Sequence, residues 1–104
     1  MSTLVKICGN RSVAEAEEAV RLGADAIGVL VGPHRESQKH FVDDMTARTI
    51  LASLPRHVKG VLVTTHHNAE DIRALVEKVG ALYVQCHSDI SLKEFSKLKS
   101  LTSA

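Results

Sequence analysis

The sequence predicts an α/β fold made of four consecutive strand–helix (βα) units with one parallel sheet. Short apolar runs alternate with amphipathic segments four times along the chain. Glycines stand where helices should end, and Gly23-Ala24-Asp25-Ala26 and Gly80-Ala81-Leu82-Tyr83 mark equivalent helix-to-strand joins in alternate units. Successive units of this kind require right-handed crossovers, so we expect the helices on the outer side of the sheet.

The first unit begins with a short apolar strand at residues 4–8, and Gly9 then allows a sharp turn of the backbone. Ser12 and Glu15 form a capping box, in which the Ser12 hydroxyl accepts the Glu15 amide and the Glu15 side chain reaches back to the Ser12 amide. A helix therefore begins at Ser12, and Gly23 should end it. Its inward stripe is predicted to comprise Val13, Ala16, Ala19 and Val20, with the acidic residues in water.

The other three units follow the same plan. Their strands are expected at residues 25–31, 58–64 and 81–86. Their helices should follow the caps Asp43, Asn68 and Ser91, and Pro55 and Gly80 should end the first two. The predicted inward faces are Ala47, Ile50, Leu51 and Leu54, then Ile72, Leu75, Val76 and Val79, and last Leu92, Phe95 and Leu98.

Composition fits one small domain spanning residues 1–104. Of these residues 44% are hydrophobic, which is enough for a core, and the formal net charge of +1 is spread evenly. With no basic run, one tyrosine and two phenylalanines, we expect no nucleic-acid partner. We also expect no membrane span and no signal peptide, and hence a cytoplasmic location.

The two cysteines are predicted to lie on opposite faces of the sheet. Alternation along a strand puts Cys8 on the same face as Lys6, whereas Cys86 lies opposite Gln85 and His87. If the polar strand residues face the ligand, Cys8 points towards it, and Cys86 points under the helices. We therefore expect no disulfide, and a ligand at the carboxyl ends of the strands.

Four segments together resemble phosphoribosylanthranilate isomerase: VKICG at residues 5–9, GADAIG at 23–28, KHFV at 39–42 and VQCH at 84–87. That family is a TIM barrel, (βα)8, of roughly twice this length. The resemblance covers essentially the whole chain and matches the first four of the eight units. It therefore implies half of a TIM barrel.

The resemblance implies an Amadori rearrangement on the way to tryptophan, without a cofactor and with a phosphorylated small-molecule substrate. A general acid opens the ribose ring to a Schiff base, and a general base then removes the proton from the neighbouring carbon. The resemblance assigns the base to Cys8, and either Lys6 nearby or a helix amino terminus would favour the thiolate. The family's acid is an aspartate in the second half of the barrel. Asp89 is the candidate replacement within this chain.

The resemblance also implies a set of substrate-binding residues. His40 aligns where the family has an arginine that holds the anthranilate carboxylate, and Lys39 and Arg35 are possible substitutes nearby. Lys6, Gln85 and His87 complete the predicted set. The family's phosphate is held by glycine-rich loops after the last two strands, which the matched half does not include.

Two other functions remain open from the residues alone. Cys8 and the strand-end histidines could bind zinc, although no tight C-x-x-C or H-x-x-x-H spacing supports a metal site; these histidines are His34, His66, His67 and His87. The chain could also be a non-catalytic half-barrel for binding or assembly. Its open sheet leaves two unpaired edges and one uncovered face. A second half-barrel, a homodimer or a rearranged flavodoxin-type sheet would each solve that problem.

Overall fold

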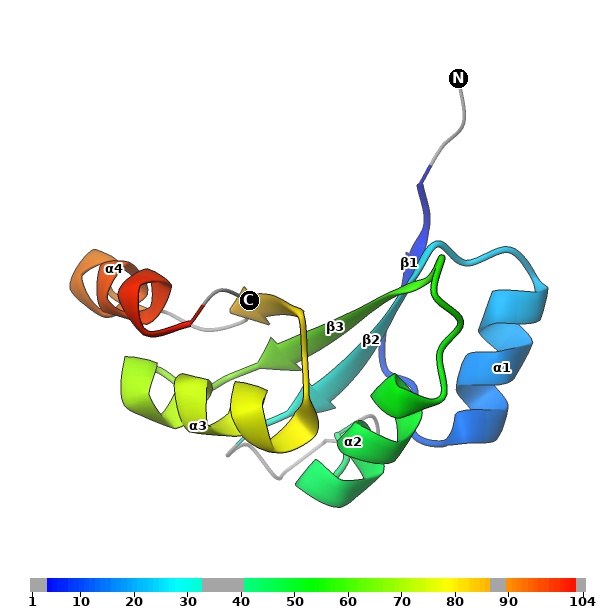
Figure 1. The fold of residues 1–104 in the computed structure, drawn as a ribbon, viewed down its shortest axis with the longest axis horizontal. Coiled ribbons are helices and arrows are strands. Elements are labelled where there is room, and N and C mark those ends of the chain that lie inside the picture. Colours follow the sequence, from blue (N-terminus) through cyan, green and yellow to red (C-terminus); the bar gives the residue numbers. More distant parts are fainter. Residues whose placement is uncertain (1–3, 33–40, 87–89, 103–104) are drawn as a thin grey trace.

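The computed structural model describes residues 4–32, 41–86 and 90–102, and it contains four βα units in sequence. The units are β1 (Lys6–Ile7) and α1 (Val13–Arg21), β2 (Ala26–Val31) and α2 (Asp44–Ala52), β3 (Lys59–Thr64) and α3 (Ala69–Val79), and β4 (Tyr83–Cys86) and α4 (Leu92–Leu101). All neighbouring strands are parallel, in the order β1-β2-β3-β4 (Figure 1). This confirms the predicted fold class, and the strand order rules out the flavodoxin-type rearrangement.

Strand alternation gives the sheet one helix-covered face and one face that we call the open face. On the covered face Ile27 and Leu62 are fully buried against Ile50 of α2 and Ile72 of α3. Helices α1, α2 and α3 lie on this one side of the strands (Figure 1). The open face carries the alternate residues: Lys6, Ala26, Gly28, Leu30, Lys59, Val61, Val63, Tyr83 and Gln85.

The predicted caps form, with one difference in the first capping box. Ser12 Oγ accepts the Glu15 amide at 3.1 Å, as expected. The Glu15 carboxylate, however, accepts the Arg11 amide at 2.9 Å instead of the Ser12 amide, since it reaches one residue further back. Gly23 and Gly80 follow α1 and α3 with φ of 104° and 75°, the left-handed conformation that favours glycine at a helix end.

Several element boundaries differ from the prediction, and β2 and β3 each begin one residue later than expected, at Ala26 and Lys59. β1 pairs only through Lys6–Ile7, and β4 begins at Tyr83, so both edge strands are shorter than their apolar runs. α2 ends at Ala52, before Pro55, because the amide of its C-cap Ser53 already bonds to the Ile50 carbonyl. Of the described helices, none is long and apolar enough to cross a membrane.

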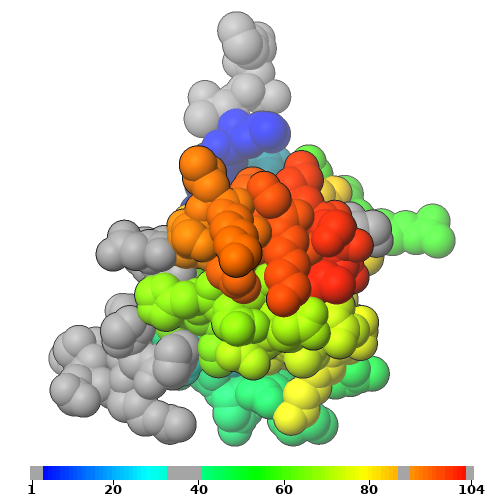
Figure 2. Space-filling model, turned by 90° about the vertical axis from the view of Figure 1, so that its left-hand side faces the viewer, coloured from blue at the N-terminus to red at the C-terminus, as the bar shows by residue number. Residues whose placement is uncertain are grey.

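Two of the three residues predicted for the inward face of α4 are wrong. Leu98 is buried, but Leu92 is 85% exposed and Phe95 is 43% exposed. Figure 2 shows α4 lying across α3, and the stripe that packs there is Leu98 with Leu101, beside Glu94, whose carboxylate accepts the Ala69 amide at 2.9 Å. This contact turns the helix so that Leu92 and Phe95 lie on a flank that nothing in the described chain covers.

Candidate functional site

Cys8 follows β1, where the backbone turns at Gly9 with a φ of 78°. Its side chain is exposed, and its Sγ lies over Gly28 of β2: a Cβ built on Gly28 would be 3.0 Å from Sγ and 3.4 Å from Val63 Cγ2. Gly28 and Val63 both belong to the open face. The thiol therefore points to the same side as Lys6, as the strand alternation predicts, and the missing side chain at position 28 gives it room.

Asn10 holds the turn that carries Cys8. It is only 4% exposed, and its side-chain amide donates to the Ile7 carbonyl at 2.8 Å and to the Gly28 carbonyl at 3.1 Å. Its backbone amide also donates to the Gly28 carbonyl, at 3.4 Å. One carboxamide thus joins the end of β1 to β2 on both sides of the thiol. Sequence reasoning missed this residue, although an asparagine directly after a strand-ending glycine is a typical turn residue.

Lys6 and Gln85 meet across the open face. Lys6 Nζ donates a hydrogen bond to Gln85 Oε1, although the two residues stand on the outermost strands, β1 and β4. In a flat sheet three strand spacings would separate those strands by about 14 Å. The contact fits a sheet that curls as the wall of a barrel does, with Lys6, Cys8 and Gln85 on its concave side.

The open face is cationic. It carries Lys6 and Lys59, and no carboxylate occurs among the open-face strand residues defined above. Lys59 Nζ lies 5.5 Å from the centre of the Tyr83 ring, at the start of β3 and β4, while Lys6 reaches towards the end of β4. A parallel sheet binds ligands at the carboxyl ends of its strands. The arrangement near Cys8 thus suits an anionic ligand.

Comparison with known proteins points to one family. The N-(5'-phosphoribosyl)anthranilate isomerase 2 of Methanosarcina mazei is 37% identical over 95 residues, which are 91% of this chain and 42% of that protein. The enzyme of Methanosarcina acetivorans is 34% identical over 99 residues, 95% of this chain and 41% of that protein. No family model matches the chain.

Solved structures agree with the sequence relatives. The phosphoribosyl anthranilate isomerase of Thermotoga maritima superimposes with a TM-score of 0.84 at 29% identity, covering 95% of this chain and 47% of that one. The enzyme of Thermococcus kodakaraensis gives 0.80 at 32% identity, with 95% and 45% covered. This chain resembles the amino-terminal half of phosphoribosylanthranilate isomerase. It spans about two fifths of the length of the curated isomerases that it matches.

Of the site residues that the isomerase resemblance implies, the structure places three: Lys6, Cys8 and Gln85 lie on the open face. The remaining predicted site residues lie outside the described residues, and so does His34; they are Arg35, Lys39, His40, His87 and Asp89. Among the described residues no three His, Cys, Asp or Glu side chains gather as a metal site would need. His66 and His67 follow β3, but they belong to no such group of ligands in the described part of the chain, so the zinc alternative receives no support from them.

Cys86 has the surroundings of a structural cysteine. It is free, packs against the core on the helix-covered face, and burial raises the pKa of its thiol. A thiol in such a place stays protonated and unreactive. Cys8 is therefore the more accessible of the two thiols, and it lies on the open face as the strand alternation predicts.

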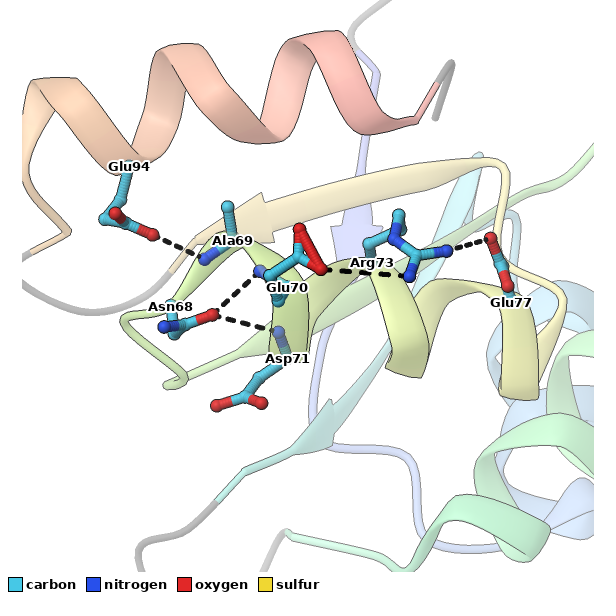
Figure 3. A network of polar contacts seen from close by, with 7 residues as sticks. All are labelled: Asn68, Ala69, Glu70, Asp71, Arg73, Glu77 and Glu94. Carbon is cyan, nitrogen blue, oxygen red and sulfur yellow. Dashed lines mark hydrogen bonds and ion pairs between the residues drawn. The ribbon is translucent and has the colours of Figure 1, made fainter.

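The amino end of α3 offers no free site for the substrate phosphate of an isomerase. Asn68 Oδ1 accepts the amides of Glu70 at 2.8 Å and Asp71 at 3.3 Å, and Glu94 of α4 accepts that of Ala69 at 2.9 Å (Figure 3). All three backbone donors are thus already taken, one of them by a carboxylate. The contact stabilises the packing of α4 on α3 instead.

Proposed function

We propose that this chain is the amino-terminal half of a phosphoribosylanthranilate isomerase, with Cys8 as its general base. The observation that carries the proposal is the position of the Cys8 thiol. It lies at the carboxyl end of β1, on the concave open face, above a residue without a side chain. Active sites of (βα)8 enzymes are built at this end of the barrel.

The reaction needs two proton transfers on N-(5-phosphoribosyl)anthranilate. An acid protonates the ribose ring oxygen, the C1–O bond breaks, and the nitrogen lone pair forms a Schiff base. Cys8 thiolate then removes the proton from C2, the C2–H electron pair forms a C1=C2 double bond, and the C1=N pair returns to nitrogen. The resulting enolamine becomes the ketone when C1 takes up a proton and the C2 hydroxyl releases one. The net change is an isomerisation, so no oxidant or cofactor is required.

Charge on the open face supports this substrate class. The substrate carries a phosphate and a carboxylate, and Lys6 lies on the same face as the thiol, with Gln85 as its hydrogen-bond partner. Cys8 would act as a base through its thiolate, which is the basic form of the side chain. We propose that Lys6 and Gln85 contact the substrate, together with Arg35, Lys39, His40 and His87.

A complete site needs a general acid and a phosphate site from elsewhere. The resemblance assigns both to the second half of the barrel, so a complementing half-barrel or a second copy of the chain must cover the open face. Asp89 is the alternative acid that this chain itself offers. Since both cysteines are free, we place the reaction in the cytoplasm, where thiols stay reduced.

A fused barrel tests the proposal. The chain is joined to the second half of the Methanosarcina mazei relative, and loss of substrate fluorescence is followed in the wild-type, Cys8→Ala and Cys86→Ala fusions. We expect isomerisation, a loss of at least about 100-fold in kcat for Cys8→Ala, and little change for Cys86→Ala. A folded fusion without activity would assign the chain to a non-catalytic half-barrel, whereas isomerisation that survives Cys8→Ala would contradict the assignment of Cys8 as the base.

The chain is also assayed by itself. Isomerisation by the isolated chain would make Asp89 the acid. Asp89→Asn should then abolish the activity of the isolated chain, whereas the same substitution should leave the fused barrel active. Without such activity the acid belongs to the second half.

A further inference from the structure

Both edges of the sheet lack a neighbouring strand within the described chain. β1 pairs only with β2, and β4 pairs only with β3. Exposed strand edges of this kind present unpaired backbone donors and acceptors to any second chain. The two edges are parallel, so a strand added to β4 in the same direction could itself be a β1.

An apolar groove runs beside the β1 edge, between β1 and α1. Its floor includes Val5, Ile7 and Leu22, which are 44%, 40% and 73% exposed. Glu15 and Glu18 of α1 stand on its rim. Exposed aliphatic side chains that gather in one groove are typical of a surface that another element covers.

At the other end of the molecule, α4 presents a matching flank. Leu92 and Phe95 are exposed there, and Lys99 follows on the same side because residues three and four apart share a helix face. Figure 1 shows α4 and α1 at opposite ends of the sheet, so this flank cannot fill the groove of its own chain.

The two surfaces are also complementary in charge. Helix α1 contains three glutamates and one arginine, and α4 contains three lysines and one glutamate. Lys93, Lys97 and Lys99 make no salt bridge within the described part of the chain. On α1, Glu15 and Glu18 already pair with Arg11 and Arg21, so the complementarity lies in the net charge of the two helices, negative for α1 and positive for α4. The α4 flank is therefore a surface of this chain that matches the groove in apolar character and in net charge.

We propose that the chain pairs with a second copy, with the α4 flank of each copy seated in the β1–α1 groove of the other. A twofold axis along the barrel axis places β4 of one copy parallel to β1 of its partner. We call this contact, in which the α4 flank of one copy meets the β1–α1 groove of the other, a seam, and the dimer has two identical seams. Eight strands then close a barrel. This partner completes the half-barrel proposed above, on which the inference rests.

A charge swap tests the seam. Lys99→Glu and Glu18→Lys are prepared separately, and the mass in solution is measured by sedimentation equilibrium from 1 to 100 µM, about the range of a weak to moderate dimer. Each variant alone should dimerise about tenfold more weakly than the wild-type chain, since attractive pairs at both seams become repulsive. An equimolar mixture of the two should regain the wild-type affinity, because each seam then joins opposite charges.

Matched controls carry the same charge changes on other faces. Lys97→Glu changes the far side of α4 from Phe95, and Glu17→Lys changes the side of α1 that faces the groove shared with α2. Neither should alter dimerisation more than about twofold. Phe95→Ser, which removes the apolar anchor of the seam, should weaken association in the mixture as well. Circular dichroism establishes that each variant stays folded.

A folded wild-type species of 11.3 kDa at every concentration would overturn the proposal, and so would a dimer that neither swap affects. Pairing with the second half of the Methanosarcina mazei relative, but never with itself, would also overturn it. None of these measurements uses enzymatic activity. A chain that dimerises as described but never isomerises would contradict only the proposed function.

Discussion

The Cys8 thiol occupies the space that a side chain at position 28 would take. A Cβ on Gly28 would lie 3.0 Å from Cys8 Sγ, closer than nearly all real Cβ contacts. Gly60 on the neighbouring strand has the same property on the other face, where a Cβ would lie 2.7 Å from Leu51 Cδ2 of α2. One glycine thus makes room for the exposed thiol, and the other makes room for the core.

Replacing each glycine with alanine should separate these two roles. Gly28→Ala pushes the thiol away from its position, so we expect at least a tenfold loss of kcat in the fused barrel, with a changed rate of Cys8 alkylation. Gly60→Ala overpacks α2 against the sheet and should cost about 1–3 kcal/mol of folding free energy. Urea unfolding and steady-state kinetics on both variants measure the two effects. Equal loss of kcat in both would contradict the assignment of Gly28.

Asn10 should matter for both stability and thiol position. Asn10→Ala removes one buried and one part-buried hydrogen bond and leaves the Gly28 and Ile7 carbonyls without this side-chain partner. We expect a loss of about 1–3 kcal/mol in the free energy of unfolding. Asn10→Asp keeps the shape but cannot donate when ionised, so it should be at least as damaging at neutral pH. An aspartate variant as stable as the wild-type chain would contradict the role of the Asn10 amide as a hydrogen-bond donor.

Lys6 and Lys59 offer a matched pair for the substrate site. Lys6 reaches towards the end of β4, whereas Lys59 lies over Tyr83 at the start of the strands. Lys6→Met should raise the KM of the fused barrel about tenfold or more, because an anionic substrate loses a charged donor. Lys59→Met should leave KM nearly unchanged, although it removes the same charge. Similar KM effects of the two variants would place the ligand elsewhere on the open face.

Ionisation of the Cys86 thiol should lower the free energy of unfolding at alkaline pH. Burial raises its pKa in the folded chain, so the unfolded chain loses the thiol proton first as the pH rises. Its contribution to stability is therefore complete below the unfolded thiol pKa of about 8.5 and declines above it. In urea unfolding followed between pH 7 and 10, Cys86→Ala should flatten that decline. An unchanged slope would show that other groups cause it.

The sequence specifies most of this fold through local signals. Serine, aspartate and asparagine caps and the terminal glycines each act within a few residues, which is why the helix starts at Ser12, Asp43, Asn68 and Ser91 are correct. The orientation of α4 is different, because it depends on the contact between Glu94 and Ala69, 25 residues apart. A helical wheel cannot show that the packed stripe includes this glutamate and excludes Phe95.

The candidate site shows the same division. Strand alternation is a local property, and it correctly placed Lys6, Cys8 and Gln85 on one face. The clamp by Asn10 depends on where the Gly28 carbonyl lies, and the contact between the two edge strands depends on how far the sheet curls. Both follow from the packed sheet as a whole, so the order of residues along the chain does not reveal them.

The bond between Lys6 and Gln85 also bears on the order of folding. It joins residues 79 positions apart, whereas neighbouring βα units close over much shorter loops. Loop closure over so long a segment is costly until the intervening strands are in place. The two edges of the sheet should therefore meet late, after the rate-limiting step. Loss of either partner would then speed unfolding and leave the refolding rate almost unchanged.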